Sequence, residues 1–533
     1  MDKANIHIAI AAAAACLAFA GNAAPVPAPK ITWDNLRQFA QCNADSVGRS
    51  VRGIVVFHGG EPGPLPAGWA QDYARQGIVA IRPSAGLADA VVGLVVERLK
   101  LPADVPVCSA GRAGGEEAAA SFARGSSHNV VSVVTNGCPL PEADAKFELA
   151  ILNSFPPAGR MACDVPDVLT AADGTRIATA AQWEKVRRPE LLKLFLGREY
   201  GERPVERPAD LSFAPIGEDR VMMDGRALRK RVSISCTGPE GPFSFSATAF
   251  VPVSEKPVGA FILICNRNPA ENIDPERVVK SGFWPAEEIV ARGYAAVAFW
   301  NGDVARDDKV GCMTTGVFRA WHRDGARTRR SWGALSAWAW GASRVLDWLE
   351  TVPQIDARRV AVVGHSRGGK TALLAGVTDT RFALACVNDS GCSGAKLNRA
   401  NLPRSESIKV ITSAFPHWFC LDYASCAGRD FELDFDQHEM VALMAPRAVA
   451  IASASEDDWA GQRGEYCSAA LASPVWRLYG LRGLEPSGNP APGEARQDGN
   501  VSYHIRVGKH NLTLEDWNRY MDFADRVFPA QRR

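Results

Sequence analysis

A serine between two glycines lies where an apolar run meets a helix-like segment. The chain reads Arg359-Val-Ala-Val-Val-Gly-His-Ser-Arg-Gly368, and small and apolar residues follow at once. This is the G-x-S-x-G pattern in a strand–turn–helix context, where a sharp turn exposes the serine hydroxyl. The turn requires small neighbours, which explains Gly364 and Gly368, and the helix N-terminus that follows favours developing negative charge. The pattern predicts that Ser366 is the nucleophile of a serine hydrolase.

One histidine is the favoured base for this nucleophile. Acyl transfer needs a histidine to take the serine proton and an acid to orient that histidine, and with this type of serine turn both follow the serine along the chain. His510 lies in Tyr503-His-Ile-Arg-Val-Gly-Lys-His-Asn-Leu512, in a turn-prone loop after an apolar strand and just ahead of a final helix from Leu514 onward. Because this is where such folds deliver their base, we expect His510 to be the base.

Three other histidines lie in the same part of the chain. His417 is embedded among aromatic residues in Phe415-Pro-His-Trp-Phe419 and is expected to be packed. His438 could cap or support the site, and His504 alternates with apolar neighbours and could face either way. Position and order therefore favour His510 over all three.

Two aspartates are candidates for the orienting acid. Asp457 follows the apolar run at residues 448–452, which is the usual acid position after the penultimate strand. Asp389 follows the run that ends at Val387 and could reach the same histidine from the other side. Capping of a loop is the commoner role of a single aspartate, but both lie at the carboxyl ends of expected strands, where such folds place their sites. The residues alone leave the choice open.

Two cationic residues lie within four positions after the nucleophile. Arg367 could supply a charged donor to the oxyanion, beside its own backbone N–H, or could simply pair with a neighbouring carboxylate. Lys370 begins the helix, where a lysine is unfavourable against the N-terminal dipole unless something compensates it. This favours a role facing a ligand for Lys370, with an ordinary surface lysine as the alternative.

Strands and helices alternate in two stretches of the chain. The first has apolar strands at residues 53–57, 78–81 and 130–134, and the second has them at 259–264, 294–299 and 382–387. An amphipathic helix is expected at residues 333–350. This alternation predicts a mostly parallel sheet with helices on both faces in each stretch. We interpret both as units of the α/β-hydrolase type, the first of them smaller.

The first stretch lacks an acid loop and a late histidine loop. Its Ser109 is therefore expected to lie in a tight strand–helix turn of an accessory unit rather than to be a second nucleophile. The linker-like composition of residues 139–166 places a boundary near residue 160. The expected organisation is a signal peptide at 1–24, an incomplete and non-catalytic unit at 25–160, and a catalytic domain at 161–533.

Composition and the N-terminus narrow the cellular setting. The 533 residues include 60 basic and 59 acidic side chains, a balance that gives no reason to expect nucleic acid or an anionic membrane as partner. Residues 8–20 are almost wholly apolar, too short for a membrane span but typical of a secretory signal cleaved near Ala24. We expect a secreted or periplasmic protein. Removing one of 13 cysteines with the signal leaves an even number, which permits disulfides.

Several ordered segments together resemble the bacterial glucuronoyl esterases, carbohydrate esterase family 15. The resemblance covers about residues 160–533 and rests on segments 364–370, 388–394, 415–419, 436–438, 454–460 and 503–510, with residues 183–204 as the start of the domain. It implies cleavage of esters between the carboxyl of (4-O-methyl)-glucuronic acid on glucuronoxylan and lignin alcohols.

The resemblance also implies roles for individual residues. Ser366 would be the nucleophile, His510 the base and Arg367 the oxyanion aid. Lys370 and Trp459 would contact the uronoyl hydroxyls, and Glu406 matches a sugar-binding glutamate. Many members have glutamate where this chain has the shorter Asp389, so we favour Asp457 as the acid and keep Asp389 as its partner or substitute.

Cofactors and oligomerisation are not expected. The cysteines and histidines show no zinc-ligand spacing, so we predict neither a metal nor a cofactor, and we expect a monomer. Two alternative functions remain: another polysaccharide-directed serine esterase, acting on acetyl-xylan or feruloyl esters, or a non-catalytic carbohydrate-binding protein on a hydrolase scaffold.

Overall fold

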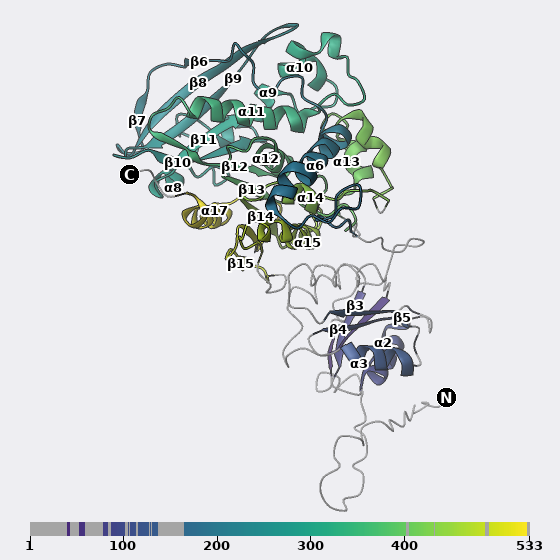
Figure 1. Cartoon of the computed structure of the whole chain (residues 1–533). Helices are drawn as coiled ribbons and strands as arrows, with labels where there is room; N and C mark the ends of the chain where they lie inside the picture. Colours follow the sequence, from purple (N-terminus) through teal and green to yellow (C-terminus); the bar gives the residue numbers. More distant parts are fainter. Residues whose placement is uncertain are drawn as a thin grey trace, which may run out of the picture. The chain divides into compact units, whose positions relative to one another are not determined.

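The computed structural model of the protein (Figure 1) divides the chain into two compact units, Met1–Ala162 and Cys163–Arg533. The predicted signal peptide lies outside the described residues. In the described part, no helix is both long enough and apolar enough to cross a membrane. The structure describes residues 40–42, 53–58, 78–83, 87–101, 105, 107–112, 116–126, 128, 130–136 and 165–529, the last range without 401–404, 431 and 485–489.

In the described residues, the N-terminal unit contains a five-stranded sheet in the order β1-β3-β2-β4-β5. Four strands are parallel, and β1 pairs antiparallel with β3 at the edge. Helix α2 (Ala88–Leu99) contributes Val91, Val92 and Val95 to the core, and α3 (Glu116–Gly125) follows β4. The strands are β1 (Ala40–Cys42), β2 (Gly53–His58), β3 (Ile78–Pro83), β4 (Val107–Arg112) and β5 (Val130–Asn136).

The C-terminal unit is built on an 11-stranded sheet, in the described residues, whose centre is parallel. The central strands β10, β11, β13 and β14 are largely apolar because helices cover both faces of the sheet. This confirms the predicted mostly parallel sheet. In spatial order the parallel strands are β16 (Val501–Arg506), β14 (Ala448–Ala454), β13 (Leu384–Asn388), β12 (Ile355–His365), β10 (Val258–Cys265) and β11 (Ala295–Trp300).

An antiparallel extension of this sheet was not predicted. Strands β9 (Gly241–Pro252) and β8 (Ala227–Gly238) form a long hairpin beside β11, and their residues largely alternate between buried and accessible. The alternation arises because one face packs on the core and the other meets solvent. Short strands continue or border the sheet at its edges: β6 (Ser212–Pro215), β7 (Arg220–Met222) and β15 (Ala495–Arg496).

Helices cover the central strands on both faces (Figure 1). On one face, α8 (Ala286–Ala291) and α17 (Leu514–Val527) pack against side chains such as Phe261 and Val363. On the other, α11 (Ala334–Leu349) and α12 (Arg367–Thr378) contact β10 and each other.

Helix α11 confirms the helix predicted at residues 333–350, but it is buried on all sides and not on one face alone. Its two charged residues pair with each other: Arg344 donates to Asp347 at 2.6 Å. Arg381 also donates to Asp347, at 2.7 Å. A helix with this pattern can be enclosed because its charges are compensated within the core.

The serine turn lies at the end of β12 and has the geometry of a nucleophile elbow. Ser366 has φ 58° and ψ −125°, a strained conformation for a residue with a side chain. Its N–H donates to the carbonyl of Asn388 at 2.9 Å, which ties the turn to β13. A Cβ at Gly364 would lie 1.9 Å from the Gly368 carbonyl oxygen. Gly364 is therefore required by the close approach of the strand to the helix, whereas a Cβ at Gly368 would meet the Ile264 carbonyl oxygen at 3.2 Å, a tight contact.

Replacing Gly364 should disrupt this turn. The added methyl of Gly364→Ala meets backbone that cannot move aside, so we expect a loss of at least about 3 kcal/mol in stability. The midpoint of thermal unfolding measures this loss. Gly197→Ala is the matched control, because no atom lies within 4 Å of its added Cβ, and its midpoint should be unchanged or raised. A wild-type midpoint for Gly364→Ala would contradict the geometry of the elbow.

Candidate active site

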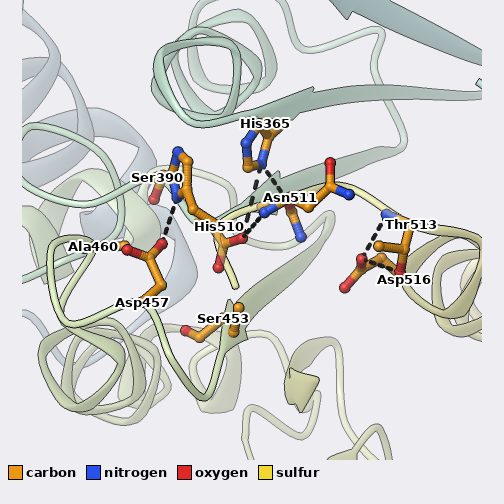
Figure 2. Close-up of polar contacts among 12 residues, drawn as sticks. His365, Ser390, Ser453, Asp457, Ala460, His510, Asn511, Thr513 and Asp516 are labelled. Atoms are coloured by element: carbon orange, nitrogen blue, oxygen red, sulfur yellow. Dashed lines mark hydrogen bonds and ion pairs between the residues drawn. The ribbon is translucent and has the colours of Figure 1, made fainter. Parts of the chain in front are cut away.

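The structure brings Asp457 and His510 into direct contact beside the elbow (Figure 2). Asp457 follows β14, and its Oδ2 lies 2.5 Å from Nδ1 of His510, which follows β16. The other oxygen of Asp457 accepts the N–H of Ala460 at 3.2 Å. The carboxylate is buried, whereas the His510 side chain is 38% exposed. The acid is thus fixed from within the protein, while the imidazole is accessible to a bound molecule.

The His510 ring lies against the residue that precedes the candidate nucleophile. The centroids of the His510 and His365 rings are 4.3 Å apart. His365 is buried, its Nδ1 lies 2.6 Å from the side-chain oxygen of Asn388, and the edge of Phe283 packs on it. Burial, together with His510, lowers the pKa of His365 well below its usual value. His365 is therefore a neutral aromatic support, a role that its place inside the serine motif did not reveal.

Asp389, the second candidate acid, lies close by but bonds differently. Its Oδ2 accepts the backbone N–H of Asn511 at 3.3 Å and lies 3.8 Å from Nδ1 of His365. It is 1% exposed, and its φ of 43° is left-handed. Burial, and then the charge of Asp457, raises its pKa well above the usual value for a carboxyl. One ligand atom from each of Asp389, Asp457 and His510 lies within 4.8 Å of the others. The Asp389 side chain therefore supports the loop that carries His510 by accepting the backbone N–H of Asn511.

Arg367 is held by an acidic residue that the sequence analysis missed. Its guanidinium forms an ion pair with Asp307 and donates to the carbonyl of Asn266 at 2.9 Å. Asp307 also lies 3.0 Å from Nε2 of His417 and accepts the indole N–H of Trp418 at 2.7 Å. Burial opposes ionisation of Asp307, but His417, Arg367 and Trp418 outweigh it and lower its pKa. Arg367 thus has a fixed direction beside the serine, and His417 is packed as expected.

Lys370, Glu406 and Trp459 lie together on the other side of the elbow. Lys370 is buried, so the surface alternative is wrong. Its ammonium donates to Glu406 at 2.7 Å and to the carbonyls of Ser390 at 2.5 Å and Cys392 at 2.7 Å. The Glu406 N–H donates to the Trp459 carbonyl at 2.9 Å, and the Trp459 side chain is 47% exposed. These three residues form one polar corner with an exposed aromatic ring.

The remaining histidines and Ser109 lie elsewhere. Nε2 of His438 contacts the carbonyl of Pro166 at 2.9 Å, and burial lowers the pKa of His438 to about 4, so it does not support the site. Nε2 of His504 lies 3.0 Å from Asp516 in the interior. Ser109 lies within strand β4 and not in a turn, which corrects that prediction, and its buried hydroxyl donates to the carbonyl of Ala119.

The even number of cysteines permitted disulfides, but several cysteines in the described part of the chain are free thiols. The free thiols include Cys236, Cys265, Cys312, Cys386, Cys392, Cys420 and Cys426.

The protein is a hydrolase of the α/β-hydrolase fold. Two features define this class: a parallel sheet with a serine elbow, and a histidine–carboxylate pair that follows two later strands. Residues 244–480 match the family model described as "Glucuronyl esterase, fungi". The chain is 33% identical over 427 residues to carbohydrate esterase MZ0003 from an unknown prokaryotic organism, covering 74% of this chain and 96% of the relative.

Further comparisons agree. A solved glucuronoyl esterase from Solibacter usitatus superimposes with a TM-score of 0.63 at 32% identity, covering 70% of this chain and 99% of that one. A 4-O-methyl-glucuronoyl methylesterase of Podospora anserina is 28% identical over 326 residues, covering 59% of this chain and 60% of its own. The chain belongs to the glucuronoyl esterases, carbohydrate esterase family 15, and is a carboxylic ester hydrolase.

The contacts of Asp307 with Arg367, His417 and Trp418 predict that its contribution to stability depends on pH. Because folding lowers the pKa of Asp307 below its ordinary 3.8, its carboxylate stabilises the fold above that pH, and the contribution is lost as pH falls through the folded pKa. Asp307→Asn should therefore cost about 1–3 kcal/mol at neutral pH. The difference from wild type should narrow below pH of about 4.

Urea unfolding at pH 7 and pH 3.5 measures this difference. Asp434→Asn is the control, because it breaks a largely exposed ion pair with Arg198 and should cost less than about 1 kcal/mol at either pH. A cost for Asp307→Asn that is equal at both pH values would show that the ionised cluster does not stabilise the fold.

Proposed function

We propose that the protein hydrolyses esters that join the carboxyl group of (4-O-methyl)-glucuronic acid on glucuronoxylan to lignin alcohols. The observation that carries this proposal is the 2.5 Å contact between Asp457 and His510 beside the elbow at Ser366, in a chain of the glucuronoyl esterase family. The printed name of the Podospora anserina relative, 4-O-methyl-glucuronoyl methylesterase, supports the uronate as the acyl part of the substrate.

The proposed mechanism uses a serine, a histidine and an aspartate, with Arg367 at the oxyanion, and passes through an acyl-enzyme. His510, held by Asp457 through Nδ1, takes the proton of Ser366 with its other nitrogen as the hydroxyl attacks the uronoyl carbonyl. The tetrahedral oxyanion lies near the N-terminus of α12, where backbone N–H groups and Arg367 stabilise it. His510 then protonates the departing alcohol, and water releases the uronic acid from Ser366 in the second half of the reaction.

Arg367 can serve the oxyanion only if its guanidinium stays in place. Its ion pair with Asp307 and its bond to the Asn266 carbonyl supply that constraint. A side chain fixed before the reaction needs no reorganisation as negative charge develops on the carbonyl oxygen. Asp307 is therefore a positioning residue in this proposal.

The sugar is proposed to bind at the corner formed by Lys370, Glu406 and Trp459. The Glu406 carboxylate offers an acceptor suited to a uronoyl hydroxyl, and Trp459 offers an exposed ring on which a sugar face can pack. Lys370 already donates all three of its N–H groups, so it contacts a uronoyl hydroxyl by exchanging one of these bonds. Because Lys370 is already bonded to two carbonyls, the corner is rigid before the substrate arrives.

The N-terminal unit is proposed to be non-catalytic, and the chain to act as an exported monomer without a cofactor. Ser109 supports the first point, since its hydroxyl is buried within a strand and bonded to a carbonyl. The apolar leader at residues 8–20 supports export.

Removing the nucleophile tests the proposed function. Ser366→Ala should lower kcat for benzyl and methyl esters of glucuronic acid at least about a thousandfold, since no acyl-enzyme can form. Ser109→Ala is the matched control and should keep the activity of wild type. Wild-type enzyme assayed on acetyl-xylan and on a feruloyl ester distinguishes the other esterase functions. Retained uronate esterase activity in Ser366→Ala would contradict the proposal.

The two aspartates should differ sharply in their effects. Asp457→Asn should lower kcat at least about a hundredfold, because the amide cannot stabilise the imidazolium or hold the correct tautomer. Asp389→Asn should lower it less than about tenfold, because an amide resembles the neutral carboxyl that its raised pKa favours. Steady-state rates on the benzyl ester measure both. A larger loss for Asp389→Asn would make Asp389 the orienting acid.

A further inference from the structure

A cavity lies beside the elbow, on the side away from the Lys370 corner. It has a volume of about 750 Å³, and its lining includes Asn266, Arg267, Trp300, Arg306, Asp307 and Arg367. These residues follow the carboxyl ends of β10 and β11, or begin α12. In the sheet, β10 and β11 lie on one side of β12, and β13 and β14 lie on the other. The cavity and the proposed sugar corner therefore flank the serine from opposite sides.

Arg267 is the cation of this cavity that lacks a carboxylate partner among the described residues. Arg306 pairs with Asp308 at 3.0 Å, and Arg367 pairs with Asp307. The guanidinium of Arg267 instead lies over the ring of Phe283, 4.2 Å from its centroid, and is half-buried. The described residues supply no carboxylate to the Arg267 guanidinium, so an acceptor or anion on a ligand can take its donors.

Trp300 provides an aromatic wall of the same cavity. It ends β11 and is half-buried. Gly302 lies directly against it, since a Cβ there would be 2.4 Å from the indole ring, so a larger residue would displace the ring. A planar group entering the cavity can therefore meet an aromatic surface and a free guanidinium together, both of which favour aromatic ligands.

We propose that this cavity binds the leaving alcohol of the ester and that Arg267 selects alcohols whose aromatic ring carries an anionic or hydrogen-bond-accepting oxygen. This rests on the proposed function, in which the uronoyl group occupies the opposite side of Ser366. The ester carbonyl at the elbow then directs its alcohol toward β10 and β11. Trp300 packs on the aromatic ring, and Arg267 donates to the oxygen substituent, a bond that charge strengthens.

The test compares three glucuronate esters that differ only in the alcohol: methyl, benzyl and 4-carboxybenzyl. In Arg267→Ala, the ratio of kcat/KM for the 4-carboxybenzyl ester to that for the methyl ester should fall about tenfold from its wild-type value. In Trp300→Leu, the benzyl-to-methyl ratio should fall about threefold. Because each ratio is measured within one protein sample, a smaller folded fraction does not alter it.

Arg358→Ala is the control for loss of one positive charge. Arg358 pairs with Asp356 near the start of β12, at the opposite end of that strand from Ser366, so all ratios should match wild type. Ratios in Arg267→Ala within twofold of wild type would overturn the assignment of the cavity while leaving the proposed function intact. A wild-type enzyme that hydrolyses none of the three esters would overturn the proposed function itself.

Discussion

The site depends on one strained residue, Ser366, held between a strand and a helix. Its left-handed backbone is possible because Gly364 allows β12 and α12 to approach within contact distance, and because neighbouring strands secure the turn. Asn388 on β13 accepts its N–H, while Asn266 after β10 donates to the carbonyl of His365 at 3.0 Å. The half-buried serine is thus held by contacts with the two strands that flank β12.

Two buried carboxylates within reach of one imidazole are kept distinct by their surroundings. Asp457 meets the His510 ring directly, whereas Asp389 lies deeper and bonds to the backbone of Asn511. Burial and the charge of Asp457 both raise the pKa of Asp389, which opposes a second negative charge beside Asp457. Charge is also compensated at Arg367, because Asp307 forms an ion pair with a cation that would otherwise lie unpaired beside the serine.

The sequence predicted those features that depend on patterns of nearby residues and on the order of segments along the chain. Apolar runs located the parallel strands, the glycine spacing located the elbow, and chain order singled out His510. The hairpin of β8 and β9 was missed, because an alternating pattern on an edge extension is weaker than a continuous apolar run. Asp307 carries no local signal, since its partners Arg367 and His417 are remote in sequence. Which aspartate meets the histidine depends on loop geometry, such as the left-handed backbone at Asp389, which spacing cannot predict.

The most direct test of the account is covalent labelling with a fluorophosphonate that traps an activated serine. After labelling of the intact protein and proteolysis, mass spectrometry should place one adduct on Ser366, at a rate that Asp457→Asn slows strongly, because the base then no longer activates the hydroxyl. Ser109 should carry no adduct, since its hydroxyl is buried in β4. An unlabelled Ser366 in active protein, or an adduct on another serine that accounts for the lost activity, would contradict the account.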